Sequence, residues 1–177
     1  MRNIELKARL ADRDRAKACC EDLGAAFQGD IHQVDTYFRV PDGRLKLREK
    51  DPGGDELIFY RREDVAEARA SDYYLAPAAP DLKPLLTEAF GVIAVVDKVR
   101  SLWFWENVRI HLDRVQGLGD FIEFEAVLSE DHDDADGHEK VTHLQKAFAL
   151  TEPIQGSYLD LILASKIEGK IADTLKR

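Results

Sequence analysis

Apolar and polar residues alternate along most of the chain, which is the pattern of strands with one buried face. Most of these segments are bounded by glycine, proline, aspartate or asparagine residues, which are typical of turns. Short turns between consecutive strands favour antiparallel pairing. The sequence therefore predicts eight strands, at residues 3–10, 28–40, 44–50, 56–62, 71–76, 92–105, 108–115 and 120–128.

Four other segments have apolar residues at helical spacing. The first follows Asp12, a favourable N-cap residue, and ends near Gly24. The others are predicted at residues 81–90, 138–150 and 157–168. The acidic stretch at residues 129–137 and the charged stretch at residues 64–70 are expected to be solvated loops.

The polar faces of several strands carry cations at regular intervals. Arg44, Lys46 and Arg48 occupy alternate positions, so three cations project from one face of a strand about 6–7 Å apart. Lys98 and Arg100 repeat this arrangement on a later strand. Like charges gathered in this way are unfavourable unless an anion or a carboxylate neutralises them.

Carboxylates are gathered in the same way on the last two predicted strands. Arg109, His111 and Asp113 share one face of residues 108–115, and Glu123 and Glu125 share one face of residues 120–128. His111 has three possible roles, as a phosphate contact, as a proton carrier or as a structural hydrogen-bonding residue. Any one of these strands could simply present its charged face to water, where ion pairs contribute only about 0–1 kcal/mol.

Closing the eight strands into a barrel would turn these charged faces inward and place the apolar faces beneath the helices. A buried interior with both cations and carboxylates favours a polyphosphate bound together with a divalent metal ion. Arginine and lysine would hold the phosphates. Oxygen ligands suit Mg²⁺ or Mn²⁺, and the candidates are Glu5, Asp113, Glu123 and Glu125.

Composition narrows the classes of function. A net charge of −9 over 177 residues argues against a surface that binds nucleic acid by neutralising phosphates. No apolar run approaches the roughly 18 residues of a membrane span, and no signal peptide is evident, so a cytoplasmic protein is expected. The two cysteines, Cys19 and Cys20, are too few for a zinc knuckle or a disulfide framework and are expected to be reduced.

The order of these motifs resembles the CYTH family, also called triphosphate tunnel metalloenzymes. The resemblance extends from Asn3 to about Gly169 and favours a single domain over residues 1–177. Residues 33–38, 43–48 and 156–161 are most similar to the class IV adenylyl cyclase branch. The resemblance implies an α+β fold in which a closed eight-stranded antiparallel barrel forms a tunnel with flanking helices.

The resemblance also implies an enzyme that acts on a triphosphate with Mg²⁺ or Mn²⁺, and a homodimer. The nearest activity is conversion of ATP to cyclic AMP and pyrophosphate, and the alternative is hydrolysis of thiamine triphosphate or inorganic triphosphate. Carried over by position, Glu5, Asp113, Glu123 and Glu125 would bind the metal. The phosphate ligands would be Lys7, Arg44, Lys46, Arg48, Lys98, Arg100 and Arg109. The family's lysine in the fourth strand falls near Tyr60 in this chain, and Arg62, on the same face, would supply the cation instead. Lys7 or Lys98 would steady the leaving pyrophosphate, and a tunnel carboxylate would accept a proton, so the catalytic candidates are Lys7, Lys98 and Glu123.

The first strand departs from the family pattern. The family signature is Glu-x-Glu-x-Lys, whereas this chain has Asn3 at the first position, followed by Glu5 and Lys7. An amide offers an oxygen but carries no charge and cannot act as a carboxylate base. A noncatalytic protein that binds a nucleotide or polyphosphate is therefore a third hypothesis. Tyr158, in the last predicted helix, either closes one mouth of the tunnel or packs in the core.

Overall fold

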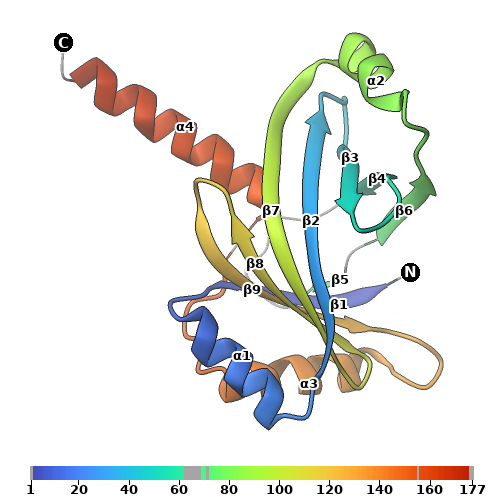
Figure 1. The fold of residues 1–177 in the computed structure, drawn as a ribbon, viewed down its shortest axis with the longest axis vertical. Helices are drawn as coiled ribbons and strands as arrows, with labels where there is room; N and C mark the ends of the chain where they lie inside the picture. The colour runs from blue at the N-terminus through green and yellow to red at the C-terminus, as the bar shows by residue number, and fades with distance from the viewer. Residues whose placement is uncertain (1, 62–68, 71, 155, 176–177) are drawn as a thin grey trace.

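The computed structural model describes residues 2–61, 69–70, 72–154 and 156–175. Its strands are β1 (Asn3–Arg9), β2 (Ala26–Phe38), β3 (Arg44–Asp51), β4 (Glu56–Arg61), β5 (Arg69–Ala70), β6 (Asp72–Pro77), β7 (Val92–Trp105), β8 (Val108–Val115) and β9 (Gly119–Val127). Its helices are α1 (Arg13–Asp22), α2 (Leu82–Phe90), α3 (Asp134–Ala147) and α4 (Tyr158–Leu175). Figure 1 shows their arrangement.

The eight predicted strands correspond to the eight longer strands of the structure, and the two-residue β5 is additional. The four predicted helices are also present. Asp12 caps α1 as expected, because its carboxylate accepts a hydrogen bond from the backbone N–H of Arg15. The prediction of a loop over residues 129–137 is wrong in its second half, where Asp133 accepts a hydrogen bond from the N–H of Asp136 and α3 begins four residues earlier than predicted.

All strands belong to one antiparallel sheet in the order β5-β1-β9-β8-β7-β2-β3-β4-β6. The sheet curls into a half-barrel that is open, so the prediction of a closed barrel is wrong (Figure 1). In the described residues, β6 pairs with β4 and β5 pairs with β1, with no ladder between the two edges. A closed barrel needs a continuous ladder at every strand pair. The two residue pairs of β5 with β1 are too short to provide one.

The long strands β2 and β7 form the back of the curl. Their pairing is interrupted at two bulges, between Phe27 and Gly29 and between Tyr37 and Phe38. A bulge bends a strand and increases its twist, which helps the sheet to curl around its charged face. Gly29 has a φ of 121°, a backbone conformation that residues other than glycine rarely adopt. Glycine therefore suits this bulge.

On β1, β8 and β9 the apolar faces point away from the concave side, as the alternation predicted. The largest core lies between the sheet and the helices α1 and α3, and a smaller core joins α2 to β2 and β3 through Leu86, Phe38 and Leu47. The strand residues of the larger core include Ile4, Leu6, Ile110, Leu112, Ile122 and Phe124. None of the described helices is both long enough and apolar enough for a bilayer crossing.

Candidate functional site

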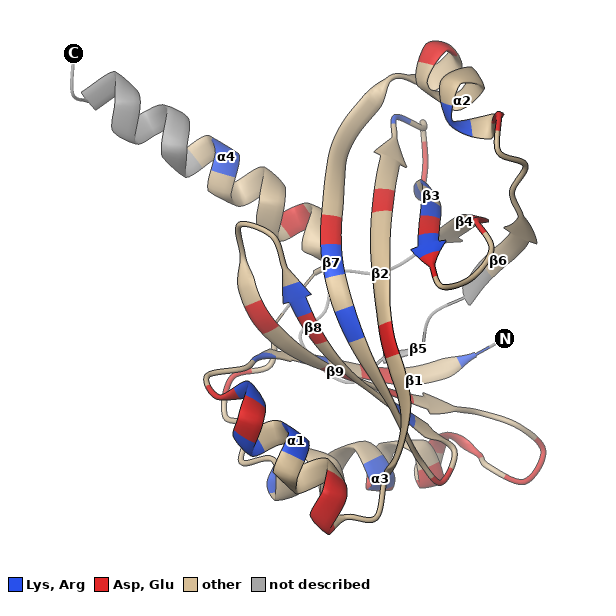
Figure 2. Ribbon diagram, viewed as in Figure 1, with Lys and Arg blue, Asp and Glu red and all other residues tan. Residues whose placement is uncertain are grey.

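The concave side of the sheet contains a cavity of about 570 Å³. Figure 2 shows basic positions on β3 and β7 and acidic positions on β2 and β9. Of the residues predicted to act in the site, Glu5, Lys7, Lys46, Arg48, Lys98, Arg100, Arg109, Glu123 and Glu125 line this cavity. Arg44 and Asp113 are not among its lining residues, and Arg62 lies outside the described residues.

The burial of these charges decides against a solvated sheet face. Only 2% of Lys98 and 6% of Arg100 is exposed, although both carry a full charge in water at neutral pH. Charged residues are seldom buried to this degree unless they are paired. The sequence therefore predicted correctly that Lys98 and Arg100 line a shared cavity. Their chemical roles stay predictions.

Asp113 anchors two of the cations. Its carboxylate is fully buried and accepts hydrogen bonds from Arg100 Nε at 2.7 Å, Lys98 Nζ at 3.0 Å and the Tyr158 hydroxyl at 2.9 Å. Burial alone would raise the pKa of Asp113, but the charges of Arg100 and Lys98 hold it well below its usual value. The carboxylate therefore stays ionised and fixes both cations on the wall of the cavity.

The ammonium of Lys98 is strongly perturbed. Burial and, to a smaller extent, the neighbouring Arg100 guanidinium lower its pKa from 10.5 to about 7. The attraction to Asp113 opposes this shift only in part. An anion bound in the cavity would favour the charged form of Lys98.

A second buried carboxylate, Asp35 on β2, was missed by the sequence analysis as a site residue. Only 2% of Asp35 is exposed, and it accepts hydrogen bonds from Lys46 Nζ at 2.8 Å and from Arg48 Nε at 2.7 Å. Burial would raise the pKa of Asp35, but Arg48 and Lys46 hold it well below its usual value. The sequence did contain a clue to Asp35, because it occupies alternate positions with Gln33 and Tyr37 and therefore shares the inner face of β2 with them.

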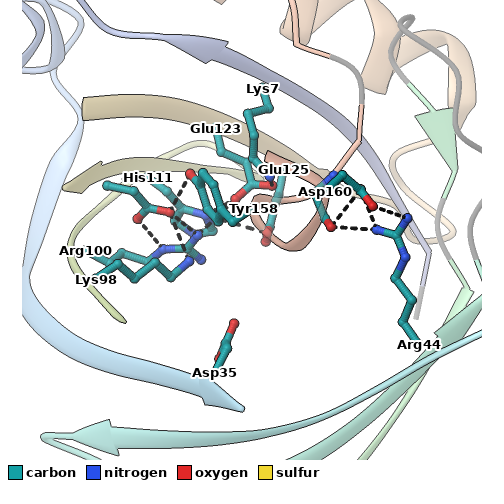
Figure 3. Close-up of polar contacts among 12 residues, drawn as sticks. Lys7, Asp35, Arg44, Lys98, Arg100, His111, Glu123, Glu125, Tyr158 and Asp160 are labelled. Carbon is teal, nitrogen blue, oxygen red and sulfur yellow. Dashed lines mark hydrogen bonds and ion pairs between the residues drawn. The ribbon is translucent and has the colours of Figure 1, made fainter. Parts of the chain in front are cut away.

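Arg44 is held at the start of α4. Its guanidinium donates to both carboxylate oxygens of Asp160, at 2.9 and 3.0 Å, and to the Ser157 hydroxyl at 2.6 Å (Figure 3). The Asp160 carboxylate also accepts the backbone N–H of Ser157, which is the capping-box arrangement of a helix N-terminus. Arg44 thus secures α4, and its predicted contact with phosphate stays a prediction.

Three potential metal ligands meet on β8 and β9. The ligand atoms of His111, Glu123 and Glu125 lie within 4.8 Å of one another (Figure 3). Two carboxylates and an imidazole suit a divalent metal ion. Glu5, another predicted ligand, lies directly opposite Glu125 in the β1–β9 register, whereas Asp113 is directed at Lys98 and Arg100.

Glu123 has two cationic neighbours, Lys7 and Arg100. Lys7 Nζ lies 3.2 Å from one carboxylate oxygen, and Arg100 Nη2 donates to the other at 2.9 Å. Burial would raise the pKa of Glu123, but the Lys7 ammonium and other positive neighbours hold it well below its usual value. A carboxylate kept ionised in this way is better suited to binding a cation than to accepting a proton.

Apolar side chains line other parts of the same cavity. Leu102 and Phe104 on β7 and Ile31 on β2 form one group. Ile58 and Tyr60 on β4 also line it. The cavity therefore offers both a charged surface and apolar or aromatic surfaces to a ligand.

Asn3 lines the cavity with Glu5 and Lys7. It is 3% exposed, and its side-chain oxygen has no hydrogen-bond partner among the described residues. A buried oxygen without a partner is unfavourable. It marks a position that a cation, a water molecule or a ligand donor would satisfy.

The CYTH domain family model matches residues 1–155. The chain belongs to the CYTH domain family. This confirms the resemblance that the motif order indicated. That the CYTH domain continues to residue 177 stays a prediction.

Three known proteins illustrate what the chain is similar to. The chain is 24% identical over 174 residues to the Methanocaldococcus jannaschii protein named "Putative adenylate cyclase MJ0240", covering 91% of this chain and 98% of that protein. It is 25% identical over 136 residues to adenylate cyclase CyaB of Aeromonas hydrophila, covering 72% and 70%. Among solved structures, the PH1012 protein of Pyrococcus horikoshii OT3 superposes with a TM-score of 0.80 at 25% identity, covering 90% and 98%.

Proposed function

We propose that this protein is a divalent-metal-dependent enzyme that binds an organic triphosphate in the concave cavity and converts ATP to cyclic AMP and pyrophosphate. The observation that carries the proposal is the pair of buried carboxylates, Asp35 and Asp113, each of which orients two cations on the cavity wall. Cations held in place before the ligand arrives need no reorganisation on binding, so they are well suited to a polyphosphate.

The charge balance of the cavity supports a polyanion with a metal ion. Among the described lining residues, seven lysines and arginines face five aspartates and glutamates. The excess of two positive charges complements a triphosphate with one divalent ion, because that complex is still an anion. The cations of this set are Lys7, Lys46, Arg48, Lys50, Lys98, Arg100 and Arg109.

The apolar lining supports an organic group on the triphosphate. Inorganic triphosphate has no surface that would gain from contact with Leu102, Phe104 or Ile31. A planar base gains stabilisation by packing against an aromatic or aliphatic side chain. A nucleoside triphosphate therefore uses both kinds of surface in the cavity.

Cyclisation transfers the α-phosphoryl group within one ATP molecule. The ribose 3′-oxygen forms a bond to the α-phosphorus, and the bond from that phosphorus to the bridging oxygen of pyrophosphate breaks. The proton of the hydroxyl passes to a cavity carboxylate or to solvent. Lys7 and Lys98 neutralise the charge that accumulates on pyrophosphate, and the flanking arginines keep the triphosphate in line for attack.

Glu123, Glu125 and Glu5 are the residues that would hold the metal ion, with Asp113 nearby on β8. A divalent ion supplies charge neutralisation of the phosphates and polarises the reacting phosphoryl group. The donor set fits such an ion, because the pKa of Glu123 is held well below its usual value and one imidazole nitrogen near the carboxylates has no hydrogen-bond partner among the described residues. The choice between Mg²⁺ and Mn²⁺, the homodimer and the cytoplasmic location stay predictions.

The proposal is tested by incubating the purified protein with ATP, thiamine triphosphate and tripolyphosphate in the presence of Mg²⁺ or Mn²⁺. Cyclic AMP and pyrophosphate are the expected products. Lys46→Met and Glu123→Gln should each lower turnover at least about tenfold, because one loses a phosphate contact and the other a metal ligand. Lys83→Met is the matched control, since Lys83 forms a half-exposed ion pair with Glu49.

Any other outcome of this experiment would indicate a different function. Orthophosphate from thiamine triphosphate or tripolyphosphate would make the protein a phosphohydrolase. Triphosphate binding without turnover would make it a noncatalytic binding protein, the case for which Asn3 was noted. Absence of any triphosphate binding, or unchanged activity in both variants, would contradict the proposed site.

A further inference from the structure

His111 is buried inside the cavity with an unsatisfied ring nitrogen. Only 4% of the residue is exposed, and its Nδ1 atom has no hydrogen-bond partner among the described residues. The nearest charged atoms are carboxylate oxygens of Glu125, at 3.5 Å, and Glu123, at 3.7 Å. Both distances exceed the range of 2.7–3.2 Å that is usual for a hydrogen bond from nitrogen to oxygen.

The tautomer of His111 that carries its proton on Nε2 needs a cation beside Nδ1. A neutral imidazole that carries its proton on Nε2 directs the Nδ1 lone pair at two negatively charged groups. Buried polar atoms in native proteins nearly always have a partner, so an atom without one requires an explanation. A metal ion between Nδ1 and the two carboxylates would provide a partner for all three groups.

The dimensions of the cluster are close to those of a metal site. Hard divalent ions lie about 2.0–2.2 Å from oxygen ligands, so two ligands of one ion are at most about 4.3 Å apart. The three ligand atoms here lie within 4.8 Å of one another, so shifts of a few tenths of an ångström would bring them together. His111 and Glu123 are direct cross-strand partners on β8 and β9, and paired strands hold ligands more accurately than loops do.

The neighbouring cations leave one oxygen of Glu125 for such an ion. Arg109 lies 3.6 Å from Oε2 of Glu125, whereas Oε1 is the atom nearest to His111. On Glu123, Lys7 approaches Oε1, and Arg100 shares Oε2 with His111. The ion would therefore sit on the His111 side of Glu125 and beside Arg100.

We propose that His111 is a metal ligand through Nδ1, together with Glu123 and Glu125, and that this nitrogen makes the cavity prefer a divalent first-row transition metal ion to Mg²⁺. Magnesium strongly prefers oxygen ligands, whereas an imidazole nitrogen is a good ligand for transition metals. The inference rests on the proposed function, because it refines the metal site of the same cavity.

The test uses Mn²⁺ as the probe and the full-length protein without nucleotide. Pulsed electron paramagnetic resonance of bound Mn²⁺ should show coupling to a ¹⁴N nucleus. The pattern should change to that of ¹⁵N when the wild-type protein is produced with ¹⁵N-histidine. His111→Ala should abolish the nitrogen coupling and weaken Mn²⁺ binding about tenfold or more, with less than a threefold effect on Mg²⁺. His32→Ala is the control, because His32 is half exposed and pairs with Asp97.

Bound Mn²⁺ without nitrogen coupling in the wild-type protein would overturn the inference and leave the proposed function intact. Coupling that survives in His111→Ala, or equal losses of Mn²⁺ and Mg²⁺ affinity, would also overturn it. The isotope measurement needs no substitution, so it decides the question even if His111→Ala does not fold. Failure of the proposed function has a different signature, which is absence of ATP or tripolyphosphate binding with or without metal.

Discussion

The Tyr158 hydroxyl donates a hydrogen bond to Asp113 over 2.9 Å and thereby connects the first turn of α4 to the anchor of Lys98 and Arg100. The Tyr158 ring also lies 4.1 Å from Lys7 Nζ and packs edge-on against Phe121. The sequence left open whether Tyr158 packs or borders the cavity. It does both, because its ring is buried in the core and its hydroxyl reaches the charged network.

Tyr158→Phe is expected to lower the free energy of unfolding by about 2 kcal/mol, because a buried hydrogen bond to a charged acceptor is lost while the ring is kept. Urea denaturation measures the change. Tyr74→Phe is the control, since Tyr74 is 69% exposed, and it should leave stability unchanged. Equal stability of Tyr158→Phe and the wild type would show that the hydroxyl contributes nothing to this network.

Asp113→Asn should destabilise the metal-free protein by about 3–5 kcal/mol, because buried Lys98 would lose its carboxylate partner and buried Arg100 would keep only Glu123. Denaturation in the presence of EDTA measures this effect. Asp42→Asn removes an ion pair with Arg61 that is mostly exposed, and it should leave stability nearly unchanged. If Asp113→Asn kept full stability in EDTA and lost only metal affinity, Asp113 would be a metal ligand rather than an anchor.

ATP binding is expected to weaken as pH rises from about 7.5 to 9. Lys98 has a pKa of about 7 in the free site, so above that pH it is neutral and must take up a proton when phosphate binds. The dissociation constant should therefore rise by up to about tenfold per pH unit. The terminal phosphate of ATP, with a pKa of about 6, is already ionised in this range.

Isothermal titration calorimetry without metal, in two buffers of different ionisation enthalpy, measures both the affinity and the proton uptake. Lys98→Met should bind ATP more weakly, and its affinity should not change steeply over the same pH range. A pH-independent affinity and no proton uptake in the wild type would contradict the assignment of Lys98 to phosphate binding.

Asn3→Glu should strengthen metal binding, because it adds a carboxylate to the cavity wall beside Glu5. Without metal the added charge should lower the melting temperature by a few degrees, and Mg²⁺ or Mn²⁺ should restore it. Asn3→Gln is the matched control, since it has the size of glutamate without its charge. If both variants melt and bind metal alike, position 3 does not contribute to the metal site.

The arrangement of the charged faces was predictable from single strands. Lys46, Lys98 and Glu123 were assigned to inner faces by alternation alone, and all three line the cavity. The open edge was not predictable in this way, because it depends on how many residue pairs β5 forms with β1. The helical start of α3 was missed because an acidic run was taken for a loop, although Asp133 is a favourable N-cap residue.

Which residues share a face follows from the sequence by itself, since the pleat of a strand places successive side chains on opposite sides. That rule identified the cations and carboxylates of the site and the apolar residues on the opposite faces of the same strands. The contacts of Asp35 with Arg48 and of Asp113 with Tyr158 were decided only by the tertiary structure. They join different strands and helices, and the distances between such elements depend on register and on the curl of the whole sheet, which no local pattern encodes.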